Sequence, residues 1–257
     1  MKLSSQTRLS QTRLLRWSTA QLLSAQLVLG VAALGVIPGS FNLAIAQQES
    51  GAEERETRRT PALRNKVYEK LAEAQAAAAA KDLNTAASVL DIMLAGRREN
   101  ELNSFGLANV YNLYAFIHYS REDFVSALQA YENVVKQPDI PLAMEINTRY
   151  TIAQLYFVQE RWRDGINALL KWFDMTTTPN ANAYVLLSQG YYQLKDYDEA
   201  LKNIQIAIGD YEGKGRIPKE QWYNLARFLY SEKNMLAEAT DVLEGLILYY
   251  PKKLYWV

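Results

Sequence analysis

The chain has 257 residues, in which 28 Lys and Arg are balanced by 28 Asp and Glu, with one histidine and no cysteine. Without cysteine the chain has no disulfide, thiolate metal site or cysteine nucleophile, and a single histidine excludes a multi-histidine metal centre. A net charge near zero argues against a protein that coats nucleic acid. The 49% of hydrophobic residues and the small number of glycines (12) and prolines (7) indicate a folded, mainly helical chain.

The first 46 residues have the order of a secretory signal peptide. Four basic residues come first and no acidic residue precedes Glu49; the basic residues are Lys2, Arg8, Arg13 and Arg16. An apolar stretch follows, densest from Leu27 to Ile37, and Ala44-Ile45-Ala46 offers small residues where a signal peptidase reads. We therefore predict cleavage after Ala46 and a periplasmic location.

Two other interpretations of residues 1–46 stay open. An acid-free segment rich in Arg, Ser and Leu is also typical of a mitochondrial presequence. The apolar stretch from Leu22 could instead remain uncleaved as a weak inner-membrane anchor, although its dense part is shorter than the roughly 20 residues of a comfortable span. Membrane contact is expected only through this segment. A lipid-modified amino terminus of the bacterial lipoprotein kind is excluded, because it requires a cysteine.

Residues 47–60 are polar and charged and cannot bury an apolar face, so they predict a solvated linker. Thr60 followed by Pro61 has the pattern of a helix N-cap with proline in the first helical position. The ordered domain is expected to span residues 61–257.

A helical hairpin is clearest between Asn182 and Gly209. One apolar face of a helix is followed by the polar turn 195–198 and by a second apolar stripe; the first face consists of Tyr184, Leu187, Ser188 and Tyr191. Ser188 and Ala200 are small enough to let the two helix axes approach closely, with Tyr197 in the turn between them.

The same unit recurs along the chain. Its close-packing residues are spaced 41, 38, 35 and 39 apart, at Ala86, Ala127, Gly165, Ala200 and Ala239. The intervals exceed the usual value of about 34 and indicate long loops at 136–141 and 209–218. The last copy, which opens with Trp222, Leu225, Ala226 and Leu229, is expected to carry one extra residue in its turn near Lys233-Asn234.

These copies resemble the tetratricopeptide repeat (TPR) family, whose pattern is met most fully by residues 184–207 and 222–251. The resemblance covers residues 61–257 and implies an all-α, right-handed solenoid of about five helix-turn-helix repeats. Leu254, Tyr255 and Trp256 begin a further first helix that is not completed, so the sequence predicts a truncated last repeat.

No catalytic pattern is found, and we expect a non-catalytic protein without a cofactor or a metal. His118 lies where other copies have Tyr156 and Tyr191, which predicts core packing or a buried hydrogen bond. The segment 213–216 lacks the Ser or Thr of a phosphate-binding loop and follows a helix. The acidic pairs Glu122-Asp123 and Asp196-x-Asp198 fall in turns, where Asp caps helix ends.

In proteins similar to this one, the face that follows the buried column lines a concave groove. We predict a partner-binding groove made of aromatic rings, amides and one arginine: Asn112, Phe116, Tyr119, Tyr150, Gln154, Phe157, Gln189, Tyr192, Asn224, Arg227 and Tyr230. Such a surface suits an extended peptide. The alternative for the rings is that they merely pack against the next hairpin. A carboxylate clamp would need a cluster of Lys and Arg, which Arg227 alone does not provide.

The segment 249–256, Tyr-Tyr-Pro-Lys-Lys-Leu-Tyr-Trp, resembles the periplasmic repeat proteins that accompany bacterial TonB and ExbB–ExbD energy-transduction systems. This resemblance implies partners among TonB, ExbB and ExbD and support of TonB-dependent transport through the outer membrane. The alternative function is glycan binding in polysaccharide export or cell-wall assembly, because rings and amides in a groove also suit sugars. Sequence does not separate the two.

Overall fold

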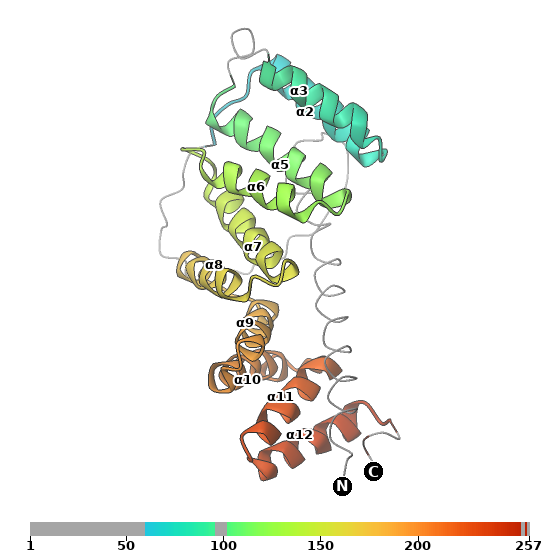
Figure 1. The fold of residues 1–257 in the computed structure, drawn as a ribbon, viewed down its shortest axis with the longest axis vertical. Coiled ribbons are helices and arrows are strands. Elements are labelled where there is room, and N and C mark those ends of the chain that lie inside the picture. Colours follow the sequence, from blue (N-terminus) through green and yellow to red (C-terminus); the bar gives the residue numbers. More distant parts are fainter. Residues whose placement is uncertain (1–59, 96–101, 253–254, 256–257) are drawn as a thin grey trace. The chain divides into compact units, whose positions relative to one another are not determined.

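The computed structural model describes residues 60–95, 102–252 and 255, which form ten α-helices and no strand. Figure 1 shows the helices following one another as antiparallel pairs. The predicted all-α fold is thereby confirmed. The predicted signal peptide, 1–46, and all of the predicted linker except Thr60 lie outside the described residues. Within the described part, none of the helices has the length and apolar character needed to cross a bilayer.

The chain divides into two compact units, the first ending at Thr151 and the second beginning at Ile152. The described residues of the first unit form two hairpins: α2 (Asn65–Ala79) with α3 (Leu83–Ala95), and α5 (Ser104–Ser120) with α6 (Phe124–Val135). The boundary falls within α7 (Leu142–Val158), and the second unit continues with α8 (Trp162–Met175), α9 (Ala181–Gln193), α10 (Tyr197–Gly213), α11 (Glu220–Glu232) and α12 (Leu236–Tyr249).

The turn inside each hairpin has the same backbone geometry. One residue per turn is left-handed, with φ between 56° and 64°: Lys81, Glu122, Glu160, Lys195 and Asn234. The N–H of the next residue donates to the carbonyl five residues earlier, at 2.9 Å in every turn. In three turns that next residue is an aspartate whose carboxylate accepts a backbone N–H of the following helix, at 3.0 Å for Asp82, 3.1 Å for Asp123 and 3.2 Å for Asp196. This confirms the capping role predicted for the turn aspartates.

Small residues bring the two helices of each hairpin close together, as the sequence predicts. Ala86, Ala127 and Ala200 are fully buried. The Ser188 hydroxyl of α9 donates to the Ala200 carbonyl of α10 at 2.7 Å, a contact that only closely spaced helix axes permit. A larger side chain at either position would force the axes apart.

Two predicted boundaries are wrong. The first helix begins at Asn65 rather than at Pro61, and residues 60–64 are non-helical. In this segment the Ala62 carbonyl accepts a hydrogen bond from the Asn103 side chain at 2.9 Å. The predicted loop from Gly209 is helical as far as Gly213. The added turn is held by the Tyr211 ring, which lies 4.6 Å from the Trp222 ring of α11.

Candidate partner-binding face

In the first unit, the predicted groove residues lie half-buried on two helices, with Asn112, Phe116 and Tyr119 on α5 and Tyr150 on α7. Phe116 packs against the core that α2, α3 and α5 share. The Tyr119 ring lies 5.5 Å from the Phe124 ring at the start of α6. Burial raises the pKa of both Tyr119 and Tyr150. Phe116 and Tyr119 therefore contribute to packing between and within hairpins, the alternative that the sequence left open for the rings.

Two predicted groove residues of the second unit, Gln154 and Phe157 on α7, are each only 3% exposed. Phe157 packs where α8 and α9 carry glycines: a β-carbon added at Gly165 would lie 3.0 Å from the ring, and one added at Gly190 only 2.7 Å. Phe157 is thus enclosed by the next two helices. It has almost no surface left for a partner.

The register of α11 differs from the predicted one by one residue. Met235 N–H donates to the Tyr230 carbonyl in the last turn just as Asp196 N–H donates to the Tyr191 carbonyl in the preceding one, so Tyr230 corresponds to Tyr191. The prediction of an extra residue near Lys233-Asn234 is therefore wrong. Instead, the apolar stripe that begins at Trp222 faces back onto α10, where Trp222 contacts Tyr211.

This register corrects the predicted place of Tyr230. Its hydroxyl accepts a hydrogen bond from Gln205 Nε2 of α10 at 2.6 Å, and its ring lines a cavity between α10 and α12. The residue that corresponds to Gln189 is Phe228, which the sequence analysis missed. Counting back from the left-handed turn residue, rather than forward from Trp222, would have found it.

The face formed by Gln189 and Tyr192 of α9 with Asn224 and Phe228 of α11 is called the α9–α11 face. These four side chains are half-buried. Arg227, which was also predicted to lie in the groove, corresponds in this register to Ser188, whose side chain packs inside its hairpin, so the structure removes it from this face. The Tyr192 and Phe228 rings meet edge to face, with centroids 5.5 Å apart and an interplanar angle of 84°. Burial is the main cause that raises the pKa of Tyr192, so its hydroxyl stays protonated and able to donate at neutral pH.

The amide oxygen Oε1 of Gln189 and Nε of Arg227 are buried without a hydrogen-bond partner among the described residues. Because both atoms are enclosed, neither is open to a bound segment. The α9–α11 face offers instead the half-buried rings of Tyr192 and Phe228.

One end of the α9–α11 face is closed by the segment after α12. The Asn224 amide donates to the Tyr255 hydroxyl at 3.0 Å, and that hydroxyl donates to Glu220 Oε1 at 2.5 Å. Lys252 Nζ donates to both Glu220 oxygens at 2.7 Å. Hydrogen bonds from Lys252 and then Tyr255 lower the pKa of Glu220. Tyr255 is 5% exposed, so Asn224 is partly committed to holding this segment.

His118 is half-exposed at the end of α5 and does not lie in the hairpin core as predicted; its side chain is 30% exposed. Its Nδ1 lies 3.5 Å from Asp123 Oδ2, and its ring stacks on Tyr114 with centroids 6.3 Å apart. Within the described ranges, no group of three His, Cys, Asp or Glu side chains is arranged to hold a metal ion.

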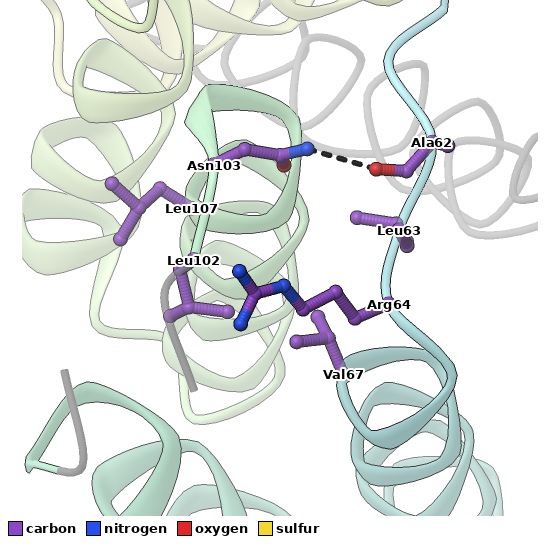
Figure 2. Close-up of a pocket in the computed structure, with 7 residues that line it drawn as sticks. All are labelled: Ala62, Leu63, Arg64, Val67, Leu102, Asn103 and Leu107. Atoms are coloured by element: carbon purple, nitrogen blue, oxygen red, sulfur yellow. Dashed lines mark hydrogen bonds between the residues drawn. The ribbon is translucent and has the colours of Figure 1, made fainter. Parts of the chain in front are cut away.

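Two cavities stand apart from the α9–α11 face. One, of about 560 Å³ in the first unit, lies between the segment before α2 and the start of α5, where Figure 2 shows Asn103 bonded to the Ala62 carbonyl and the Arg64 side chain extending beside Leu102. Its remaining lining residues are apolar: Leu63, Val67 and Leu107. The other cavity lies between α10 and α12.

Solved structures share this arrangement of helical hairpins. YrrB, a TPR protein with an unusual peptide-binding site, matches 74% of this chain and 91% of its own with a TM-score of 0.57 and 14% identity. The fold is a tetratricopeptide-repeat solenoid. The apo form of RapI matches 71% of this chain and 69% of its own (TM-score 0.57, 13% identity).

A third similar structure is MamA from residue 41 onward, from Desulfovibrio magneticus RS-1, which matches 72% of this chain and 93% of its own (TM-score 0.54, 14% identity). Neither a protein-family model nor a curated protein matches the sequence. At these identities the likeness concerns the fold. The chain's own residues must therefore carry any argument about function.

Proposed function

We propose that this protein is a non-catalytic scaffold that binds an extended segment of a partner protein on the α9–α11 face. The observation that carries the proposal is the pair of half-buried rings on that face, Tyr192 and Phe228, which meet edge to face with centroids 5.5 Å apart. These rings supply apolar contact area for a bound segment, and the Tyr192 hydroxyl can donate a hydrogen bond to a backbone carbonyl.

The type of ligand follows from the charges on the face. None of the four side chains that define the face is charged, so it lacks the cluster of basic side chains that a carboxylate clamp needs. The expected ligand is therefore the backbone and side chains within a peptide, rather than its carboxy terminus. The peptide-binding site of YrrB, which has the same fold, is consistent with this use of the architecture.

The proposal extends to the cell compartment and to the partner. The signal-peptide pattern of residues 1–46 supports export to the periplasm, with an inner-membrane anchor as the alternative. The resemblance of residues 249–256 supports TonB, ExbB or ExbD as partner. In the structure, Tyr250, Lys252 and Tyr255 also have packing roles, since the Tyr250 hydroxyl donates to the Pro218 carbonyl at 2.8 Å.

The test is site-specific photocrosslinking of the full chain in envelope fractions. A photoreactive residue replaces Tyr192 on the α9–α11 face or, as control, Lys202, whose side chain is 64% exposed on α10. We expect a protein to be captured from position 192 and not from position 202. Capture of TonB, ExbB or ExbD would support the finer proposal. Equal capture from both positions, or from neither, would refute the scaffold role of this face.

Glycan binding is the competing outcome. Retention of the chain on soluble polysaccharide, lost in both Tyr192→Ala and Phe228→Ala, would support it and exclude the peptide proposal. Truncating a central aromatic contact costs about 1–4 kcal/mol, so a loss of about fivefold or more in affinity is expected for whichever ligand the face binds.

A further inference from the structure

A concave surface lies away from the α9–α11 face. It is a cavity of about 510 Å³ between α10 and α12, called the α10–α12 cavity, with side chains of α11 at its base. Tyr223 and Tyr230 of α11 are 4% and 9% exposed, and Tyr249 of α12 is 43% exposed. The Tyr223 and Tyr249 rings are nearly parallel, at 12°, with centroids 6.3 Å apart. A volume of this size falls within the range of about 300–1,000 Å³ typical of ligand sites.

Hydrogen bonds fix the aromatic rings at the base. The Tyr223 hydroxyl donates to Glu212 Oε1 at 2.7 Å, and the Tyr230 hydroxyl accepts from Gln205 Nε2 at 2.6 Å. Both partners come from α10, so the rings are tied to one wall of the cavity. The site is therefore preformed rather than dependent on a rearrangement of side chains.

Two glycines in the walls leave the cavity open. A β-carbon at Gly209 of α10 would meet no atom within 4 Å, and one at Gly245 of α12 would meet only the Tyr223 ring, at 3.7 Å and beyond. Alanine would thus fit at both positions, and it would be more favourable within a helix by about 0.5–1 kcal/mol. Packing inside the chain does not require these glycines. What they provide is room for another molecule to approach the helix backbone closely.

The cavity is strongly acidic. Its charged lining residues are Glu212, Asp241 and Glu244, and no lysine or arginine is among the residues that line it. On α10, Lys214 pairs instead with Asp210 at 2.5 Å. The helix α12 contains no basic residue. Three carboxylates around stacked tyrosines form a surface complementary to a cation with a flat or apolar body.

We propose that the α10–α12 cavity binds an arginine-bearing segment of a partner protein. A guanidinium group stacks on tyrosine rings and forms paired hydrogen bonds with carboxylates, a combination that an ammonium group does not match. Apolar neighbours of the arginine contact Leu248, which is 71% exposed at the cavity rim. This site is separate from the α9–α11 face and would let the second unit of the chain hold two segments at once.

Fluorescence anisotropy with the full chain tests the proposal. The probe is a short fluorescein-labelled peptide in which arginine alternates with leucine, compared with peptides in which glutamate or glutamine replaces arginine. We expect saturable binding of the arginine peptide alone. Gly209→Trp, which places a large side chain in open space in the cavity wall, should weaken binding at least about tenfold, and Glu244→Lys should do the same by charge reversal. Gly209→Ala is the matched control and should bind like the parent chain.

The outcomes separate this inference from the proposed function. Loss of binding in Gly209→Trp and Glu244→Lys, with Tyr192→Ala unchanged, supports the α10–α12 cavity. Loss in Tyr192→Ala alone would place the peptide on the α9–α11 face and overturn the inference without touching the proposed function. Equal binding of the glutamate or glutamine peptide, or no binding at all, would also overturn it. If Gly209→Trp fails to fold, as circular dichroism would show, Glu244→Lys decides.

Discussion

The same substitution, glycine to alanine, is expected to have opposite effects at two positions of the second unit. At Gly190 on α9 the new β-carbon would lie 2.7 Å from Phe157 Cε1 and 2.8 Å from Ile166 Cγ1. Carbon atoms in contact prefer about 3.5–4.0 Å, so both neighbours must move. At Gly209 on α10 the β-carbon would meet nothing within 4 Å.

The magnitudes follow from these distances. Both helices gain about 0.5–1 kcal/mol from replacing glycine with alanine, and this gain should be the whole effect at Gly209. At Gly190, overpacking against buried side chains costs about 1–3 kcal/mol and outweighs the gain. Urea unfolding followed by circular dichroism should therefore show Gly209→Ala as more stable than the parent and Gly190→Ala as less stable. The two variants should differ by about 1–3 kcal/mol.

A double mutant identifies the cause. If the clash with the Phe157 ring is responsible, Phe157→Leu should remove part of the penalty of Gly190→Ala, with a coupling energy above about 0.5 kcal/mol. Equal stabilisation by Gly190→Ala and Gly209→Ala would refute the packing role assigned to Phe157. Strict additivity of Phe157→Leu and Gly190→Ala would refute the direct contact.

Two further predictions concern single hydrogen bonds. Ser188→Ala removes the buried hydrogen bond to the Ala200 carbonyl and should lower the free energy of unfolding by about 0.5–1.5 kcal/mol in the same urea assay. Ser188→Val should lower it further, because the larger side chain also pushes the two helices apart. If Ser188→Val left the free energy of unfolding unchanged, the close packing would be contradicted. Glu220 has a pKa below its ordinary value of 4.5, so its bonds to Lys252 and Tyr255 contribute stability above that pH and lose it as the pH falls through the lowered pKa. In the parent chain, the Tyr255 amide should accordingly lose its protection from hydrogen exchange as the pH falls. In Glu220→Gln the same amide should be less protected at the outset and should show no pH-dependent loss. Identical pH profiles in the two proteins would show that Glu220 does not hold this segment.

The candidate site was only partly predictable from sequence. Gln189, Tyr192 and Asn224 lie on first helices as expected, since each follows a residue of the stripe that packs inside its hairpin, whereas Arg227 belongs to that stripe. Phe157 has the same sequence pattern as Tyr192 but is enclosed, because Gly165 and Gly190 let neighbouring helices close over its ring. Periodicity assigns a residue to a side of its own helix. It does not reveal what another helix places against that side.

For the part of the chain that the structure describes, the sequence by itself determined the all-α architecture, the five hairpins and their close contacts, because the helical period and the small residues recur visibly along it. Only the tertiary structure decided the register of α11. Trp222 and Tyr223 are both large and both buried, so the pattern of apolar residues fits either of two registers that differ by one residue, or about 100° of rotation. The backbone hydrogen bonds of the turn and the contact of Trp222 with Tyr211 select one of these two registers. In that register, Tyr223 and Tyr230 face the cavity between α10 and α12.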